Sequence, residues 1–84
     1  MAEIPELTMG ALRRWVDHGI WPGSFLTSVL QDNLFQSVHR ADEENRAALG
    51  ALVVYIFNNV PVACWGSEES MLEWQAYRQH QKRS

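Results

Sequence analysis

Residues 42–61 carry the strongest structural signal in this sequence. The Asp42 carboxylate can accept a hydrogen bond from the backbone N–H of Asn45, and two glutamates follow Asp42, as at the start of a helix. The apolar residues that come next are spaced three and one positions apart, which is typical of one wide helix face: Leu49, Leu52, Val53, Ile56 and Phe57. Pro61 cannot continue a helix. We therefore predict a central helix to about Asn58, with Phe57 as a core aromatic.

Two further helices are predicted near the ends of the chain. Thr8 is a candidate cap for a first helix running to about His18, and Gly19 then offers the left-handed conformation that commonly ends a helix. Ser67 is a candidate cap for a last helix, which begins with two glutamates and ends with basic residues, as the helix dipole favours.

Residues 24–40 also hold apolar side chains at helical spacing, after a turn formed by Trp21-Pro22-Gly23-Ser24. Asp32 and Asn33 interrupt the pattern. Two interpretations stay open, one bent helix or two separate ones.

The length of 84 residues leaves room for a single core. Because the apolar period is near 3.6 and not 2, strands are excluded almost everywhere. We predict an all-α fold: a small single-domain bundle of four or five helices over residues 1–84, with a loose lead-in at 1–7 and a loose tail at 79–84. A homodimer that buries surplus apolar surface is a second route to stability for so short a chain.

The sequence shows neither a membrane-spanning segment nor a secretory signal. The longest apolar stretch runs from Ala51 to Phe57, far below the ~20 residues that a bilayer requires. Glu3 and Glu6 lie where a secretory signal would carry positive charge. We expect a cytoplasmic protein with no membrane partner.

The acidic residues dominate most of the chain. Residues 1–74 hold four arginines against ten acidic residues, a net charge of −6, although the whole chain carries −3. Such a charge repels phosphates, so direct DNA or RNA binding is disfavoured and a basic protein surface is the better partner.

No arrangement of residues predicts catalysis, a cofactor or a metal site. The three histidines, His18, His39 and His80, lie in separate segments, and two or fewer ligands do not hold zinc. Cys64 is the only cysteine, so an internal disulfide is impossible, and we expect a buried thiol in an apolar linker. We therefore predict that the protein is not an enzyme.

Four tryptophans are a large number for this length. Trp15 and Trp74 fall on the inner faces of predicted helices and are assigned to the core. Trp21 and Trp65 fall in predicted loops, where they either close the ends of the core or dock a partner.

Several short strings between Trp15 and Trp74 carry a resemblance. They are His18-Gly19-Ile20, Pro22-Gly23, Phe25-Leu26-Thr27, Arg40-Ala41-Asp42 to Asn45, Asn58, Pro61 and Cys64-Trp65-Gly66-Ser67. In these residues the chain resembles a group of short, largely uncharacterised proteins encoded by bacteriophages, prophages and integrated elements of proteobacteria. The resemblance implies a role against host defence, as in anti-CRISPR proteins, which occupy a basic surface on a larger complex.

The main functional hypothesis is a non-enzymatic inhibitor acting in the cytoplasm of a bacterial host. Its partner would be a host protein or protein–RNA complex with a basic surface, such as a CRISPR surveillance complex. The candidate partner-binding residues are Asp42, Glu43, Glu44, Glu68, Glu69, Trp21 and Trp65.

Two alternatives come from other classes of protein. One is a self-associating structural or regulatory accessory protein of the element, with no host target. The other is a small-molecule or nucleotide binder that uses the helix start at Gly23 and Ser24.

Overall fold

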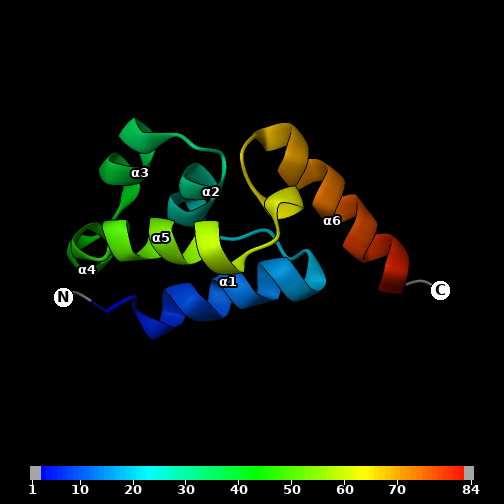
Figure 1. Ribbon diagram of the computed structural model, residues 1–84, viewed down its shortest axis with the longest axis horizontal. Coiled ribbons are helices and arrows are strands. Elements are labelled where there is room, and N and C mark those ends of the chain that lie inside the picture. Colours follow the sequence, from blue (N-terminus) through cyan, green and yellow to red (C-terminus); the bar gives the residue numbers. More distant parts are fainter. Residues whose placement is uncertain (1–2, 83–84) are drawn as a thin grey trace.

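The computed structural model describes residues 3–82, which form six α-helices and one 3-10 helix and contain no strand (Figure 1). The predicted all-α class is confirmed. In chain order the elements are α1 (Glu6–His18), α2 (Ser24–Leu30), α3 (Leu34–Arg40), α4 (Glu43–Ala47), α5 (Leu49–Asn59), η1 (Val62–Cys64) and α6 (Glu68–Lys82). The molecule is elongated, with extents of 42 × 22 × 21 Å. The α4 helix lies towards one end of the long axis and α6 towards the other (Figure 1).

There are six α-helices, where the sequence predicted four or five, because two segments are divided. Residues 24–40 form two helices, since Asp32 adopts a positive φ of 60° and Asn33 caps α3 by accepting a hydrogen bond from the Gln36 N–H. The predicted central helix is interrupted at Ala48, whose φ of −95° and ψ of 2° separate α4 from α5.

Three of the four predicted helix-terminal signals are confirmed. Asp42 Oδ1 accepts a hydrogen bond from the Asn45 N–H at 2.8 Å, and Ser67 Oγ accepts one from the Ser70 N–H at 3.1 Å. Gly19 ends α1 with a φ of 68°. The Thr8 cap is wrong, because α1 already begins at Glu6 and the Thr8 side chain is buried within the fold.

The two predicted loose ends are partly helical. The first two residues of α1 fall within the lead-in at 1–7, and α6 continues through the tail at 79–84 as far as Lys82. Residues 1–2 and 83–84 lie outside the described residues.

The core lies where α1, α2, α5, η1 and α6 meet. Its buried members are Leu12, Trp15, Leu26, Leu30, Leu52, Ile56, Val60, Cys64 and Met71. Trp15 is fully buried, and its indole Nε1–H donates to the Cys64 carbonyl at 3.1 Å. The prediction that Trp15 is a core residue is confirmed.

The α6 helix docks on the C-terminal end of α1 through side-chain donors. Trp74 Nε1–H donates to the carbonyls of Val16 at 3.2 Å and Trp15 at 3.3 Å, and Arg78 Nε–H donates to Val16 at 3.0 Å. The Trp15 carbonyl also accepts a hydrogen bond from the Gly19 N–H at 2.9 Å. The Val16 carbonyl is one of the last carbonyls of α1, which have no partner inside the helix, so the Trp74 and Arg78 donors satisfy a group that would otherwise be costly to bury. Trp74 is half-buried against the core, as predicted for an inner-face residue.

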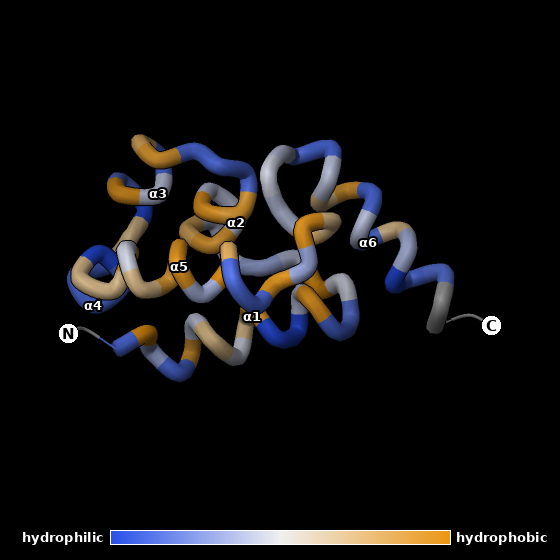
Figure 2. The backbone as a smooth tube through the Cα atoms, viewed as in Figure 1, coloured by the Kyte–Doolittle hydropathy of each residue, from blue (hydrophilic) through white to orange (hydrophobic). Residues whose placement is uncertain are grey.

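The predicted inner face of the central helix is partly wrong. Leu52 and Ile56 are buried, but Val53 is 48% exposed and Phe57 is 72% exposed. The reason is that α5 contains no charged residue, so its apolar pattern does not distinguish an inner from an outer side. Figure 2 shows more apolar character along α5 than along α6.

Candidate functional site

The first predicted acidic group stands at the start of α4. Asp42, Glu43 and Glu44 are all exposed. Asp42 holds the helix start through its hydrogen bonds to Asn45, whereas the two glutamates occupy the first turn, where the helix dipole favours negative charge. Capping therefore explains Asp42 but leaves the two glutamates available for a partner.

The fold adds two carboxylates that the sequence analysis did not assign to a site. Glu3, Glu6 and Glu44 line one open hollow of about 400 Å³ between the starts of α1 and α4. The two helices are joined there by the Thr8 hydroxyl, which donates to Asn45 Oδ1 at 2.6 Å. We call Glu3, Glu6, Asp42, Glu43 and Glu44 the acidic end. No sequence signal could have brought Glu3 and Glu6 together with Asp42–Glu44. The 35 residues between Glu6 and Asp42 must fold before these two segments come close.

The second predicted acidic group lies elsewhere. Glu68 and Glu69 are exposed in the first turn of α6. Figure 1 places α4 and α6 towards opposite ends of the long axis, so the fold does not bring these two glutamates to the acidic end. The predicted acidic residues thus form two separate groups.

The two loop tryptophans both pack against the core and keep part of their surface exposed. The Trp21 ring meets the buried Trp15 ring edge-on at 5.5 Å between centroids and is 37% exposed. Trp65 is half-buried, and its Nε1–H donates to the Val60 carbonyl at 3.3 Å. The buried part of each of the two rings is therefore explained by its packing against the core.

An exposed apolar face of α5 is the feature that the sequence analysis missed. Val54 is 59% exposed and lies with Val53 and Phe57 on the outer side of the helix. A signal for it existed, since the absence of any charged residue over Leu49–Asn59 means that no charged side was available to face water.

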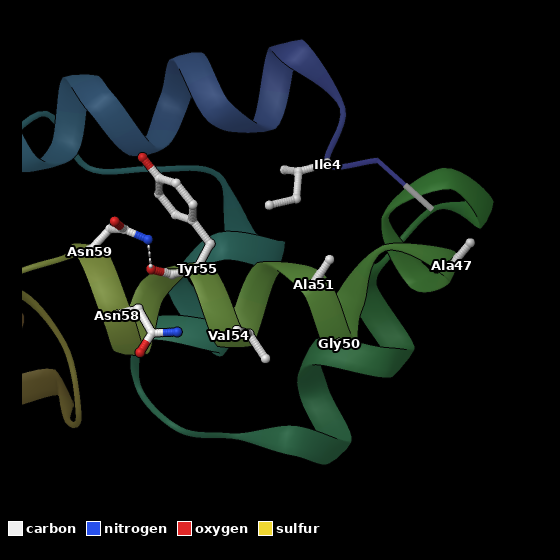
Figure 3. Close-up of a pocket in the computed structure, with 8 residues that line it drawn as sticks. All are labelled: Ile4, Ala47, Gly50, Ala51, Val54, Tyr55, Asn58 and Asn59. Atoms are coloured by element: carbon white, nitrogen blue, oxygen red, sulfur yellow. Dashed lines mark hydrogen bonds between the residues drawn. The ribbon is translucent and has the colours of Figure 1, made fainter. Parts of the chain in front are cut away.

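An open hollow of about 690 Å³ adjoins this face (Figure 3). Its floor is formed by small residues of α4 and α5, and its far wall by Ile4 and the ring of Tyr55, which points towards α1. Asn59 Nδ2–H donates to the Tyr55 carbonyl at 3.1 Å at one edge. Most of the lining is apolar and none of it is charged, although Tyr55, Asn58 and Asn59 add polar groups. Such a lining suits a hydrophobic side chain better than a charged ligand.

The one thiol is poorly suited to nucleophilic chemistry. Cys64 is completely buried, as predicted, and burial raises the pKa of its thiol from 9.0 to about 11, against a smaller lowering by Arg78. Because the thiolate is the reactive form, a thiol with this pKa reacts slowly at neutral pH.

The titratable side chains of residues 3–82 form no cluster of three or more that could hold a metal ion. His18, His39 and His80 are exposed on α1, α3 and α6 respectively. Among the described helices, none has the length and apolar character needed to cross a membrane.

Comparisons with protein-family models, with curated proteins and with solved structures found no match to this chain. The two surfaces described above, the acidic end and the outer face of α5, therefore carry the functional argument.

Proposed function

We propose that this chain is a non-enzymatic inhibitor that places its acidic end over a basic, nucleic-acid-binding surface of a host protein complex. The observation that carries the proposal is that Glu3, Glu6 and Glu44 line one hollow at the starts of α1 and α4, with Asp42 and Glu43 exposed beside Glu44 at the start of α4. The resemblance to proteins of phages and integrated elements points to a defence effector, such as a CRISPR surveillance complex in the host cytoplasm.

The charge of the acidic end determines which surfaces it attracts and which it repels. Exposed carboxylates facing lysines and arginines accelerate encounter and occupy the positions that nucleic-acid phosphates would take. The same charges repel free DNA or RNA, so the protein competes with nucleic acid and does not bind it. Since exposed charges are screened within about 8–10 Å at physiological salt, inhibition by this route weakens as the salt concentration rises.

The test compares two charge reversals of equal size at the two separate acidic groups. One variant carries Glu43→Lys and Glu44→Lys, and its matched control carries Glu68→Lys and Glu69→Lys. Both change the net charge equally, and both alter the first turn of a helix. The readout is plaque formation by a phage that a CRISPR system restricts, in cells that express each variant.

Wild-type protein is expected to restore plaque formation, and the Glu43/Glu44 reversal is expected to lose that effect. The Glu68/Glu69 reversal should retain it, because these residues lie away from the acidic end. A third variant with Glu3→Lys and Glu6→Lys should behave like the Glu43/Glu44 reversal. If both α4 and α6 reversals restored plaques as well as the wild type, the acidic end would have no part in inhibition. No rescue by the wild type across the common defence systems would refute the proposed function itself.

A second candidate is a self-associating accessory protein of a mobile element, without a host target. The observation that favours it is the exposed apolar face of α5, which an acidic-end mechanism leaves unexplained. An acidic inhibitor could itself self-associate through this face, so the two candidates use different surfaces and are tested separately.

A further inference from the structure

A small hollow lies beside the exposed ring of Phe57, between α2, the turn that follows α2, α5 and the segment after η1. Its volume is about 90 Å³. The residues that line it are Val29, Asp32, Val53, Ile56, Phe57 and Trp65. We call it the Asp32 hollow. Pockets for whole small molecules measure roughly 300–1,000 Å³, so this one has the size for the head group of a single side chain.

Two aromatic rings line the Asp32 hollow. The centroids of the Phe57 and Trp65 rings lie 6.2 Å apart, with 53° between the ring planes. Phe57 is 72% exposed, whereas Trp65 is half-buried and is held by the hydrogen bond from its Nε1–H to the Val60 carbonyl at 3.3 Å. Because the face of an aromatic ring carries partial negative charge, a pair of rings at an open hollow attracts cations.

Asp32 adds a full negative charge to the same hollow. It is exposed and has a φ of 60°, in the left-handed region where glycine is the usual residue after a helix. The turn is fixed by hydrogen bonds from the Asp32 N–H to the Val29 carbonyl at 3.1 Å and from the Asn33 N–H to the Ser28 carbonyl at 2.9 Å. None of the six lining residues is positively charged, so the lining combines a carboxylate and two rings without a basic side chain.

Another aromatic pair in this chain shows what such an arrangement binds. On α6, the centroids of the Trp74 and Tyr77 rings lie 5.4 Å apart, with 41° between the planes. The guanidinium carbon of Arg78 lies 4.8 Å from the Trp74 centroid and 5.8 Å from the Tyr77 centroid. An arginine of the same chain therefore contacts both rings of that pair through cation–π interactions. The pair at the Asp32 hollow has a similar geometry and a carboxylate beside it.

We propose that the Asp32 hollow is the docking site for an arginine side chain of the partner protein. The guanidinium lies against the Phe57 and Trp65 rings, and its N–H groups donate to the Asp32 carboxylate. Arginine fits better than lysine, because the planar guanidinium stacks on rings and can pair with a carboxylate through two parallel hydrogen bonds. This inference deepens the proposed function and rests on it, since it names the side chain of the basic partner surface that meets Trp65, one of the residues that the sequence predicted to bind a partner.

The Asp32 charge selects a cation over other occupants. A phosphate or a carboxylate would be repelled by Asp32. An uncharged apolar side chain would cover the Asp32 carboxylate without giving it a partner, and an unpaired charge is costly to bury. A guanidinium satisfies the carboxylate and the two rings at the same time.

The binding test uses N-acetyl-arginine amide as its probe, because this molecule carries a guanidinium and no other charge. One cation–π contact and one exposed ion pair give an expected Kd on the order of 10–100 mM. Two-dimensional NMR of the isotope-labelled full chain, titrated through this range, should show saturable shifts at the Trp65 indole and at the backbone amides of Asp32 and Phe57. N-acetyl-citrulline amide, the uncharged analogue, should cause no saturable shift at the same chloride concentration.

Matched substitutions of exposed residues test the carboxylate and the ring. Asp32→Asn removes the charge, and Asp32→Gly removes the whole side chain at a φ that suits glycine, so each should raise the Kd about threefold or more. Asp17→Asn, the same change of charge on α1, should leave the Kd unchanged. Phe57→Leu should raise the Kd about twofold or more, whereas Phe35→Leu, at a ring that is 87% exposed on α3, should not.

Several outcomes would overturn the proposal. Equal shifts with the arginine and citrulline probes would show that the charge is not recognised, and a Kd unchanged by Asp32→Asn and Phe57→Leu would place the probe elsewhere. Tighter binding of free arginine than of the amide probe would assign the hollow to the amino acid and not to a protein side chain. A Trp65 shift that depends on protein concentration alone would assign it to a second copy of this chain.

The NMR titration contains no host complex, so the two proposals fail in different ways. Plaque recovery by the wild type without saturable probe binding would refute the arginine site and leave the inhibitor function standing. Probe binding at the Asp32 hollow without plaque recovery would refute the inhibitor function and leave the affinity for a guanidinium established.

Discussion

Replacing Trp15 with phenylalanine tests the centre of the fold most directly. The Trp15 side chain is fully buried and packs between α1 and the other core helices. Its Nε1–H is a hydrogen-bond donor to the Cys64 carbonyl in η1. Phenylalanine keeps an aromatic ring at this position but removes both the donor and part of the volume.

Two terms set the magnitude of the loss. The smaller ring leaves a cavity that costs about 1–2 kcal/mol, less than the ~3–5 kcal/mol of truncation to alanine. The Cys64 carbonyl loses its donor while it stays buried, which costs about 1–3 kcal/mol. The expected loss is therefore about 2–5 kcal/mol, a large part of the roughly 4–13 kcal/mol typical of a domain of this length.

Urea and thermal denaturation followed by far-UV circular dichroism measure this loss without depending on tryptophan emission. The melting temperature should fall by at least about 10 °C. Trp21→Phe is the matched control, because the same substitution at a partly exposed ring should cost less than about 1 kcal/mol. A loss below about 1 kcal/mol for Trp15→Phe, or equal losses at the two positions, would refute the assignment of Trp15 to the centre of the core.

Three further predictions concern other positions. In a urea titration of dilute protein, Phe57→Ala should lower the free energy of unfolding by less than about 1 kcal/mol. Ile56→Ala should lower it by about 2–5 kcal/mol in the same titration. Equal losses would show that Phe57 is a core residue. Gly19→Ala should cost about 1–3 kcal/mol, because φ is 68° and the new Cβ would lie 2.9 Å from Arg78 Cβ; unchanged stability would contradict the left-handed helix end. Because burial raises the Cys64 thiol pKa above 9.0, the native state keeps a proton that the unfolded chain releases, so stability should fall between pH 9.0 and about 11. Cys64→Ala should reduce that slope, and an identical slope would show that the thiol is not shielded.

The sequence by itself determined the helix class and several helix ends. Asp42, Ser67 and Gly19 act within one turn of their own positions, so their roles depend on local hydrogen bonds and backbone preference and not on the rest of the fold. The burial of Trp15 was equally predictable, because its helix has a polar side that leaves only one way to face the core.

Tertiary structure decided what the local pattern leaves open. On α5 no charged side chain marks the side that faces solvent, so only packing against α1, α2 and η1 selected Leu52 and Ile56 for the interior and left Phe57 outside. The sequence prediction of Phe57 as a core residue failed for that reason. The acidic end has the same origin, because Glu3 and Glu6 meet Glu44 only when α1 packs beside α4, and such contacts between distant segments depend on the whole core.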